Sequence, residues 1–331
     1  MKLSVVIPVH NGRQNLRLCL EALAESIRLP DELIVVDDAS TDGSAALAEK
    51  LGARVLRLPG PPRGAALPRN RGAASASGDL LVFLDADVAV HPDALERAER
   101  TMSEHEEIAA LFGSYDANPR APGLVSRYKN LLHHYVHQHG QREASTFWTG
   151  FGAIRPGAFH GLGGFNESYS HLEDIELGAR LRLAGYRIWL CPEVQVTHLK
   201  RWTLGSLLRS DIFDRAIPWS RLILQSSNLP AELNLDFRSR WSALAVWVAV
   251  VFLLLAWRWP WASVGTLLSL VVVGALNADL YRFLWRQGGP LFGIAAAGLH
   301  VFYLFYSSLV FALVAAQAAL SRLRAVTRTG E

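Results

Sequence analysis

Asp79-Leu-Leu-Val-Phe-Leu84-Asp85-Ala86-Asp87 joins an apolar run to two aspartates, and this stretch decides the fold. The run reads as a buried strand, and α/β proteins keep their ligand chemistry where such strands leave the sheet. Because residues two apart in extended backbone point to the same side, we expect Asp85 and Asp87 to face one divalent cation or one polyphosphate. Two solvated aspartates at a strand end are the alternative, since an isolated pair of this kind is a weak signal.

Strands that alternate with helices surround this stretch. Short β-rich runs occupy residues 3–9, 32–36, 54–58 and 80–84, and helical spacing occupies residues 13–26, 41–51 and 93–105. Two further strands are predicted at residues 186–191 and 194–197. This order predicts an α/β fold with a doubly wound, mainly parallel sheet.

Polar residues gather at the predicted carboxyl edge of this sheet. Asp37 and Asp38 end the second strand, immediately before residues 40–43, which can cap a helix. Arg69 and Asn70 stand at the start of the next helical stretch. Backbone amides and arginines in these positions can hold phosphate.

Three later segments supply candidates for substrate contact and proton transfer. Trp148 and Gly150 lie in an aromatic, glycine-rich stretch that can form a concave wall, although such glycines can also serve only tight turns. Glu173 and Asp174 begin a predicted helix, where they either stabilise its amino terminus or provide a general base. His198 follows a predicted strand, where a neutral imidazole can complete the coordination of a metal.

Four histidines crowd residues 133–139. His133 and His137 are four residues apart and would share a helix face. Such a group beside aromatic residues is more often an adaptable surface than a metal site, and its role stays open. Cys19 and Cys191 lack metal-binding or disulfide spacing and are expected in the core.

Composition divides the chain into a globular part and a membrane part. Half of the 331 residues are hydrophobic, and residues 242–320 are almost continuously apolar. The formal charge of +3 and the lack of a basic, aromatic stripe argue against binding of nucleic acid. Anionic lipid headgroups are the better partner for the basic and aromatic residues 200–221.

Several of these motifs, taken together in order, resemble glycosyltransferase family 2. They are Val-Val-Ile-Pro-Val-His-Asn at 5–11, Val-Val-Asp-Asp-Ala-Ser at 35–40, Arg-Asn-Arg-Gly at 69–72, Leu-Asp-Ala-Asp at 84–87 and Leu-Glu-Asp-Ile-Glu-Leu at 172–177. The resemblance covers roughly residues 1–205. It implies a GT-A fold, a nucleotide-sugar donor linked to UDP or GDP, and inversion at the anomeric carbon.

The resemblance also implies roles for single residues. Pro8, Asp37 and Asp38 would hold the nucleoside, with Asp38 contacting the base or ribose. Arg69, Asn70 and Asp85 would contribute to donor binding.

Metal binding and catalysis fall to the remaining motif residues. Asp85 and Asp87 would meet Mg²⁺ or Mn²⁺, with Asp87 the more direct ligand and His198 a third. Asp174 would be the catalytic base, with Glu173 in support. Trp148 and Gly150 lie outside these motifs, and their stretch of aromatic residues and glycines makes them the candidates for acceptor contact.

The apolar carboxyl-terminal region predicts two or three transmembrane helices. Residues 242–257 and 262–276 would form a hairpin around an interfacial turn at 257–261, and residues 291–320 are long enough to cross alone. Three crossings from a cytosolic amino terminus place the basic residues at 322–328 outside, against the positive-inside tendency. Two crossings and one interfacial helix avoid that conflict.

The sequence therefore predicts three parts: a GT-A catalytic domain at 1–205, an amphipathic interfacial linker at 206–240 and a membrane region at 241–331. The predicted activity is transfer of a sugar to a hydroxyl of a lipid or lipid-linked glycan, with the catalytic domain on the cytosolic face of the cell membrane. Two alternatives are a polyprenyl-phosphate glycosyltransferase and a membrane binding subunit that keeps the fold without catalysis.

Overall fold

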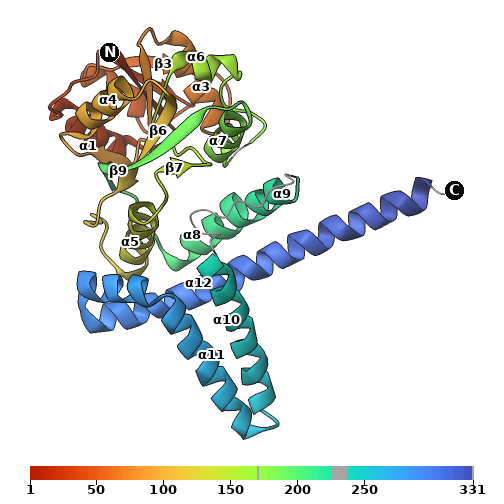
Figure 1. Ribbon diagram of the computed structural model, residues 1–331. Coiled ribbons are helices and arrows are strands. Elements are labelled where there is room, and N and C mark those ends of the chain that lie inside the picture. The colour runs from red at the N-terminus through yellow and green to blue at the C-terminus, as the bar shows by residue number, and fades with distance from the viewer. Residues whose placement is uncertain (170, 226–236, 330–331) are drawn as a thin grey trace. The chain divides into compact units, whose positions relative to one another are not determined.

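The computed structural model describes residues 1–169, 171–225 and 237–329. The chain divides into two compact units, Met1–Arg201 and Trp202–Glu331 (Figure 1). Residues 226–236, which belong to the predicted interfacial linker, lie outside the described residues.

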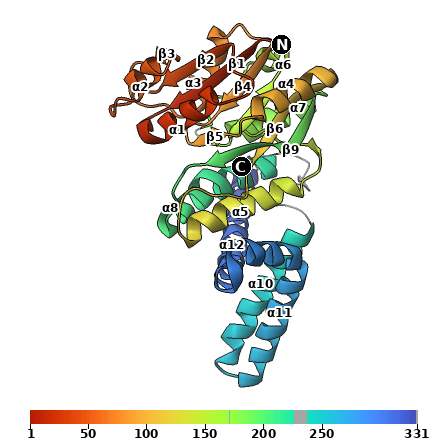
Figure 2. The same cartoon turned by 90° about the vertical axis from the view of Figure 1, so that its left-hand side faces the viewer.

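The first unit is built on one mixed sheet (Figure 2). Its described strands are β1 (Leu3–Val9), β2 (Glu32–Asp37), β3 (Arg54–Arg57), β4 (Leu80–Leu84), β5 (Val88–Val90), β6 (Ile108–Tyr115), β7 (Glu143–Ala144), β8 (Phe151–Ile154) and β9 (Arg187–His198). They lie in the order β3-β2-β1-β4-β8-β6-β9-β5, and β7 pairs with β9. The first four are mutually parallel, as predicted, whereas β8 runs antiparallel to both β4 and β6.

Side chains from both faces of this sheet are buried, which explains why its strands read as unbroken apolar runs. Helices of the first unit are α1 (Arg13–Ala24), α2 (Ser44–Lys50), α3 (Ala66–Ser75), α4 (Ala94–Glu104), α5 (Leu124–Gln138), α6 (Pro156–Gly161) and α7 (Glu173–Leu183). On β4, Leu80, Val82 and Leu84 pack with α1 and α4. The alternate residues Leu81 and Phe83 pack with α3, α6 and α7 on the other face.

Two sequence predictions differ from this arrangement. The strands predicted at 186–191 and 194–197 are one continuous strand, β9, which pairs with β6 along its length and with β5 near its end. The predicted start of a helix at Arg69 is wrong, because α3 begins at Ala66 and places Arg69 in its second turn. Proline at position 68 is compatible with this, since it falls within the first turn, where its missing N–H has no helical partner.

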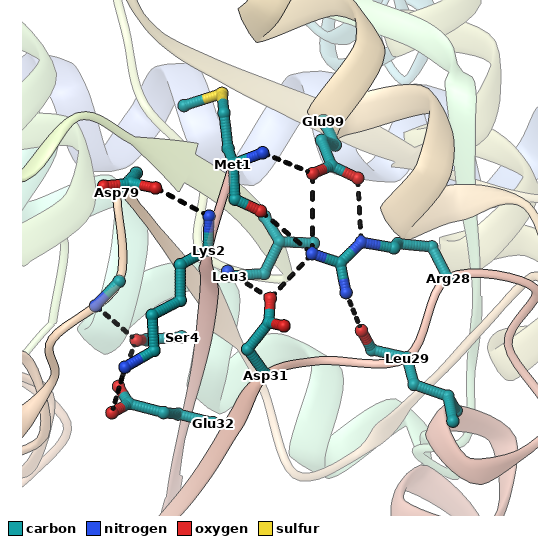
Figure 3. A network of polar contacts seen from close by, with 11 residues as sticks. Met1, Lys2, Leu3, Ser4, Arg28, Leu29, Asp31, Glu32, Asp79 and Glu99 are labelled. Carbon is teal, nitrogen blue, oxygen red and sulfur yellow. Dashed lines mark hydrogen bonds and ion pairs between the residues drawn. The ribbon is translucent and has the colours of Figure 1, made fainter.

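Ion pairs close the amino edge of the sheet (Figure 3). Arg28, which follows α1, donates to Glu99 of α4 and to Asp31 ahead of β2. Lys2 contacts Glu32 at 3.1 Å and also donates to Ser77. These contacts tie the starts of neighbouring strands together, far along the strands from the predicted site residues at the carboxyl edge.

The second unit is helical. Its described elements are α8 (Leu204–Arg209), a π-helix (Ser210–Ala216), α9 (Ile217–Gln225), α10 (Phe237–Ala256), a 3-10 turn (Pro260–Ala262), α11 (Ser263–Leu276) and α12 (Ala278–Thr329). Gly289, with φ of 78°, breaks α12 just before Pro290. Helices α10 and α11 pack as a hairpin, in which Asn277 donates to Ser242 at 2.8 Å.

Two helices among the described residues have the length and apolar character needed to cross a membrane. They are Phe237–Ala256 and Ala278–Ser321, and the intervening apolar helix Pro260–Leu276 is shorter. Only 22% of the apolar window in each long helix is buried, whereas the core helix of a soluble protein would be mostly buried.

The close approach of α7 to the segment before β8 predicts a cost for any side chain at Gly178. A Cβ there would lie 2.4 Å from the Phe147 backbone nitrogen. We expect Gly178→Ala to destabilise the first unit by about 1–3 kcal/mol, since backbone must move to make room. The thermal unfolding midpoint of the full chain in detergent measures this.

Gly161→Ala is the matched control, because Gly161 also lies in a helix and a Cβ there meets nothing within 4 Å. Equal unfolding midpoints for the two variants would contradict the proposed close packing of α7.

Candidate active site

The carboxyl ends of β1, β2 and β4 bring the predicted donor residues to one edge. Pro8 lies in β1 beside Val36 of β2, and Asp37 ends β2. Asp38 is buried, and its Oδ2 accepts bonds from the backbone nitrogens of Arg63 and Gly64 at 2.8 and 3.1 Å. Asp38 therefore holds the loop at 59–64 against the end of β2.

Strained backbone marks this edge. Among the described residues, Asn11, Ala39 and Leu172 are the non-glycine residues with positive φ, at 50°, 59° and 65°. Asn11 follows β1, Ala39 follows β2 and Leu172 precedes α7. Such conformations cost about 1–3 kcal/mol each and tend to collect at functional sites.

The Asp85-Ala86-Asp87 segment is a turn between β4 and β5, so the expectation of extended backbone here is wrong. Ala86 packs against the core cluster that includes the buried residues of α1. The two carboxylates take different partners: Asp85 contacts Arg69 at 2.5 Å, and Asp87 lies 3.6 Å from Nε2 of His198. Both aspartate side chains keep about 30% exposure.

Arg69 is buried and holds two carboxylates at once. Its guanidinium donates to Asp85 through Nη2 and to Glu173 through Nη1. Burial works against its charge, but the surrounding carboxylates outweigh burial and raise the pKa of Arg69. Its Nε finds no partner among the described residues. One cation thus joins the end of β4 to the first turn of α7.

Asp174 differs from its neighbour Glu173 in exposure. Glu173 is buried in the ion pair with Arg69, whereas Asp174 is only half-buried. The backbone nitrogen and Oγ1 of Thr149 each donate to Asp174 Oδ2 at 3.4 Å. Asp174 is therefore fixed in place and still accessible, which a proton acceptor requires.

Burial and crowding of negative charge set the ionisation of these carboxyl groups. Burial, then the Glu173 charge, raises the pKa of Asp174 to about 6, against the opposing charge of Arg69. Burial also raises the pKa of Asp85 to about 6, with Arg69 opposing it and Asp87 adding to it. Burial acts against ionisation of Asp87 too, but the His198 contact outweighs it and lowers the Asp87 pKa.

Asn70 lies next to Arg69 on α3, and its amide binds a loop of the protein. Its Nδ2 donates to the Phe165 carbonyl and to Glu167, and its Oδ1 accepts from the Phe165 nitrogen at 2.9 Å. A Cβ on Gly164 would lie 2.6 Å from that same Oδ1. These contacts position the loop before α7. They also engage both the nitrogen and the oxygen of the Asn70 amide, the groups with which Asn70 would contact a donor.

Trp148 and Gly150 lie beside the carboxyl end of β4, because Phe151 of β8 pairs with Leu84. A Cβ on Gly150 would lie 2.0 Å from Cζ2 of Trp148, so only glycine lets the indole ring lie here. Tyr115 packs edge-on against Trp148 at 4.9 Å between ring centroids.

Helix α5 gives the histidine-rich segment a place in the site. The rings of His133 and His137 lie 4.3 Å apart, which confirms that they share a helix face. They pack against Trp148 at 5.2 and 5.1 Å. His137 is buried, and burial lowers its pKa to about 4, which keeps it neutral.

The sequence did not single out Tyr115, Asn130 or Thr149. Tyr115 ends a buried strand, β6, that was not predicted, and Asn130 lies in α5, where the pattern of the sequence is loose. Thr149 follows Trp148 directly, so its place in the aromatic, glycine-rich stretch was the available signal.

Two of the three predicted metal ligands, Asp87 and His198, lie close to each other. His198 Nδ1 donates to Asn130 Oδ1 at 2.6 Å, which turns Nε2 toward Asp87. Asp85 is instead held by Arg69. Across residues 1–169, 171–225 and 237–329, no group of three or more His, Cys, Asp or Glu side chains converges as a ready metal site. Asp87 and His198 fit a metal that a donor diphosphate completes.

Sequence comparison assigns the first unit to a family. The family model described as "Glycosyl transferase family 2" matches residues 4–162. The match to glycosyltransferase family 2 covers most of the first unit.

A relative of this glycosyltransferase extends the match beyond that domain. The succinoglycan biosynthesis protein ExoA of Rhizobium meliloti (strain 1021) is 28% identical over 311 residues, which cover 84% of this chain and 93% of that protein. The undecaprenyl-phosphate 4-deoxy-4-formamido-L-arabinose transferase of Serratia proteamaculans (strain 568) is 36% identical over 146 residues, or 40% of this chain and 43% of that one.

Among solved structures, this glycosyltransferase is similar to the mannosyltransferase PcManGT of Pyrobaculum calidifontis, solved with GDP-Man and Mn²⁺. The TM-score is 0.56 at 19% identity, with 91% of this chain and 87% of that chain covered. This likeness confirms the predicted GT-A fold.

Removal of the buried cation is predicted to cost more stability than any surface change. Arg69→Met leaves Asp85 and Glu173 without their shared partner, and loss of one member of a buried ion pair typically costs about 3–5 kcal/mol. Pulse proteolysis of the full chain in urea and detergent, scored on the catalytic domain, measures the loss. Arg71→Met is the control, because Arg71 is exposed on the same helix. Similar losses for both variants would contradict the central place of Arg69.

Proposed function

We propose that this protein is a metal-dependent, inverting glycosyltransferase that uses Asp174 as its base. The acceptor is a hydroxyl of a lipid or lipid-linked glycan, and the donor is a UDP- or GDP-linked sugar. The observation that carries this proposal is the contrast between buried, paired Glu173 and accessible Asp174, whose pKa is raised to about 6. A base near this pKa is mostly ionised at neutral pH and still accepts a proton effectively.

The proposed reaction is a single displacement. The acceptor hydroxyl oxygen forms a bond to the anomeric carbon as its proton passes to Asp174, and the bond from that carbon to the diphosphate oxygen breaks. The nucleoside diphosphate leaves with the bonding electron pair. Thr149 holds Asp174 in position, and the Arg69–Glu173 ion pair fixes the helix turn that carries it.

The donor side is proposed to use the carboxyl edge of the sheet. Pro8, Asp37 and Asp38 border the nucleoside, and Asp87 and His198, joined by Asp85, would hold Mg²⁺ or Mn²⁺. The metal, when bound, stabilises the negative charge that develops on the diphosphate. Support comes from the Mn²⁺ named with PcManGT and from the Asp87–His198 separation of 3.6 Å.

A hydroxyl acceptor is favoured over a phosphate by the groups around Trp148. The partly exposed Trp148 forms the wall, buried Tyr115 and neutral His137 pack against it, and Asp174 adds negative charge nearby. The buried arginine of the site, Arg69, is already paired with two carboxylates. A sugar ring stacks well on such aromatic faces, whereas a phosphate dianion would meet a carboxylate.

A polyprenyl-phosphate acceptor is the second candidate, and the similarity to an undecaprenyl-phosphate transferase favours it. A phosphate is already ionised at neutral pH and needs no base. The two candidates therefore differ in how they depend on Asp174.

Asp174→Asn is predicted to lower kcat by about 10²–10⁴-fold while donor affinity is kept, because the variant cannot accept the proton. In the parent, kcat/KM is expected to rise with pH up to about 6 and to level off above it, since Asp174 must lose its proton to act. Release of nucleoside diphosphate from UDP- and GDP-sugars, with membrane extract as acceptor, measures both.

Glu176→Gln is the control, because Glu176 lies in the same turn of α7 but pairs with Arg180. Full turnover by Asp174→Asn would exclude the base and favour the phosphate acceptor. A parent protein that hydrolyses none of these donors would instead be a binding subunit.

The second unit is proposed to anchor the enzyme in the cell membrane by three crossings, with the catalytic domain in the cytosol. The 20 residues of α10 span about 30 Å at 1.5 Å per residue, which equals the hydrocarbon thickness. Helix α11 returns beside α10, and the part of α12 beyond Gly289 crosses last.

This topology predicts that the carboxyl terminus lies outside the cytosol. Alkaline phosphatase fused after Glu331 of the full chain is expected to be active, and green fluorescent protein fused there is expected to be dark. The reverse result would replace the third crossing with an interfacial helix.

A further inference from the structure

We infer that Tyr115 is a positioning residue that couples the donor side of the site to the acceptor side. The inference rests on the proposed function, because it takes Asp87 and His198 as donor-side groups and Trp148 as the acceptor wall. Its consequence is that occupation of the donor site changes the environment of Trp148.

The ring of Tyr115 contacts both sides of the site. It stacks on the His198 imidazole with 4.4 Å between centroids and 13° between planes. It also meets Trp148 edge-on, at 4.9 Å and 88°. A shift of either neighbour therefore displaces Tyr115, because interiors packed this closely leave few voids.

His198 has little freedom to move without Tyr115. Nδ1 of the imidazole is bonded to buried Asn130, and Nε2 faces Asp87. A ligand that draws His198 toward or away from Asp87 rotates or shifts the imidazole about the Asn130 bond. Because the Tyr115 ring lies parallel to the His198 imidazole and in contact with it, the Tyr115 ring moves when the imidazole moves.

The acceptor side is equally confined. Trp148 lies over Gly150 and against the rings of His133 and His137. His133 touches Tyr115 as well, at 4.7 Å. A displaced Tyr115 therefore presses on Trp148 directly and through His133.

Helix α5 fixes the backbone on which Tyr115 stands. His134 Nδ1 donates to the Tyr115 carbonyl at 2.7 Å, and His137 Nδ1 donates to the Gly113 carbonyl at 3.1 Å. The β6–β9 register shifts between Phe112 and Ser114, directly before Tyr115. Because the backbone is held, the Tyr115 ring is the part that can move when His198 or Trp148 moves. Three of the four histidines, His133, His134 and His137, thereby have a role in holding Tyr115 or Trp148.

The test follows the Trp148 environment by fluorine NMR of the full chain in detergent, labelled with 5-fluorotryptophan. Trp148→Phe identifies the resonance. Mg²⁺ with UDP, and in a parallel sample Mg²⁺ with GDP, serve as donor-side probes. We expect the nucleotide that binds to shift the Trp148 resonance in the parent and in Tyr115→Phe.

Tyr115→Leu and Tyr115→Met remove the ring and are expected to reduce that shift at least fivefold. Their affinity for the nucleotide, measured by calorimetry, is expected to change less than threefold. Two variants are used because one of them can lose stability through its changed volume. Tyr135→Leu is the control, because the Tyr135 ring stacks on His139 at the end of α5.

A shift that persists in both ring-deleted variants would overturn the inference. So would a parent protein whose Trp148 resonance does not respond to bound nucleotide. If that parent also hydrolyses a nucleotide-sugar, the coupling fails and the proposed reaction stands, so the two failures are distinguishable.

Discussion

The buried guanidinium of Arg69 is the constraint on which the site depends. Asp85 ends a strand in the middle of the sheet and Glu173 begins a helix about 90 residues later, and both carboxylates meet one cation. Two carboxylates this close to each other, one of them buried, would otherwise repel and favour protonation. Paired with Arg69, they fix the turn from which Asp174 projects. The same arrangement leaves Asp87 and His198 to meet a ligand.

The sheet explains why polar groups collect where they do. Both of its faces are covered by helices, so the central strands β1 and β4 carry no charged side chain along their length and the site carboxylates lie beyond their ends. At the amino edge charged side chains pair with one another around Arg28 and Lys2. At the carboxyl edge burial first, and then the charge of neighbouring carboxylates, raises the pKa values of Asp85 and Asp174. An edge with excess carboxylate suits a divalent cation and a base.

Much of the fold followed from local pattern. Apolar runs predicted β1 to β4, and tryptophan, proline and arginine marked the turn between α10 and α11. The antiparallel insertion of β8 and the unbroken β9 depend on contacts between residues far apart, which no local pattern carries. For the same reason the sequence could identify the motif residues, but it could not show which side chain each of them contacts. Those contacts are what give the motif residues different roles. Asp85 and Asp87 look equivalent in sequence, yet Arg69 takes one and His198 the other.

Arg69 joins Asp85 and Glu173 in one ion-pair network. A double-mutant cycle with Asp85→Asn and Glu173→Gln, read as free energies of unfolding by pulse proteolysis of the full chain, tests it most directly. The account predicts a coupling of at least about 1 kcal/mol, because groups that share an ion-pair network are not additive. Additive losses, within about 0.3 kcal/mol, would contradict it.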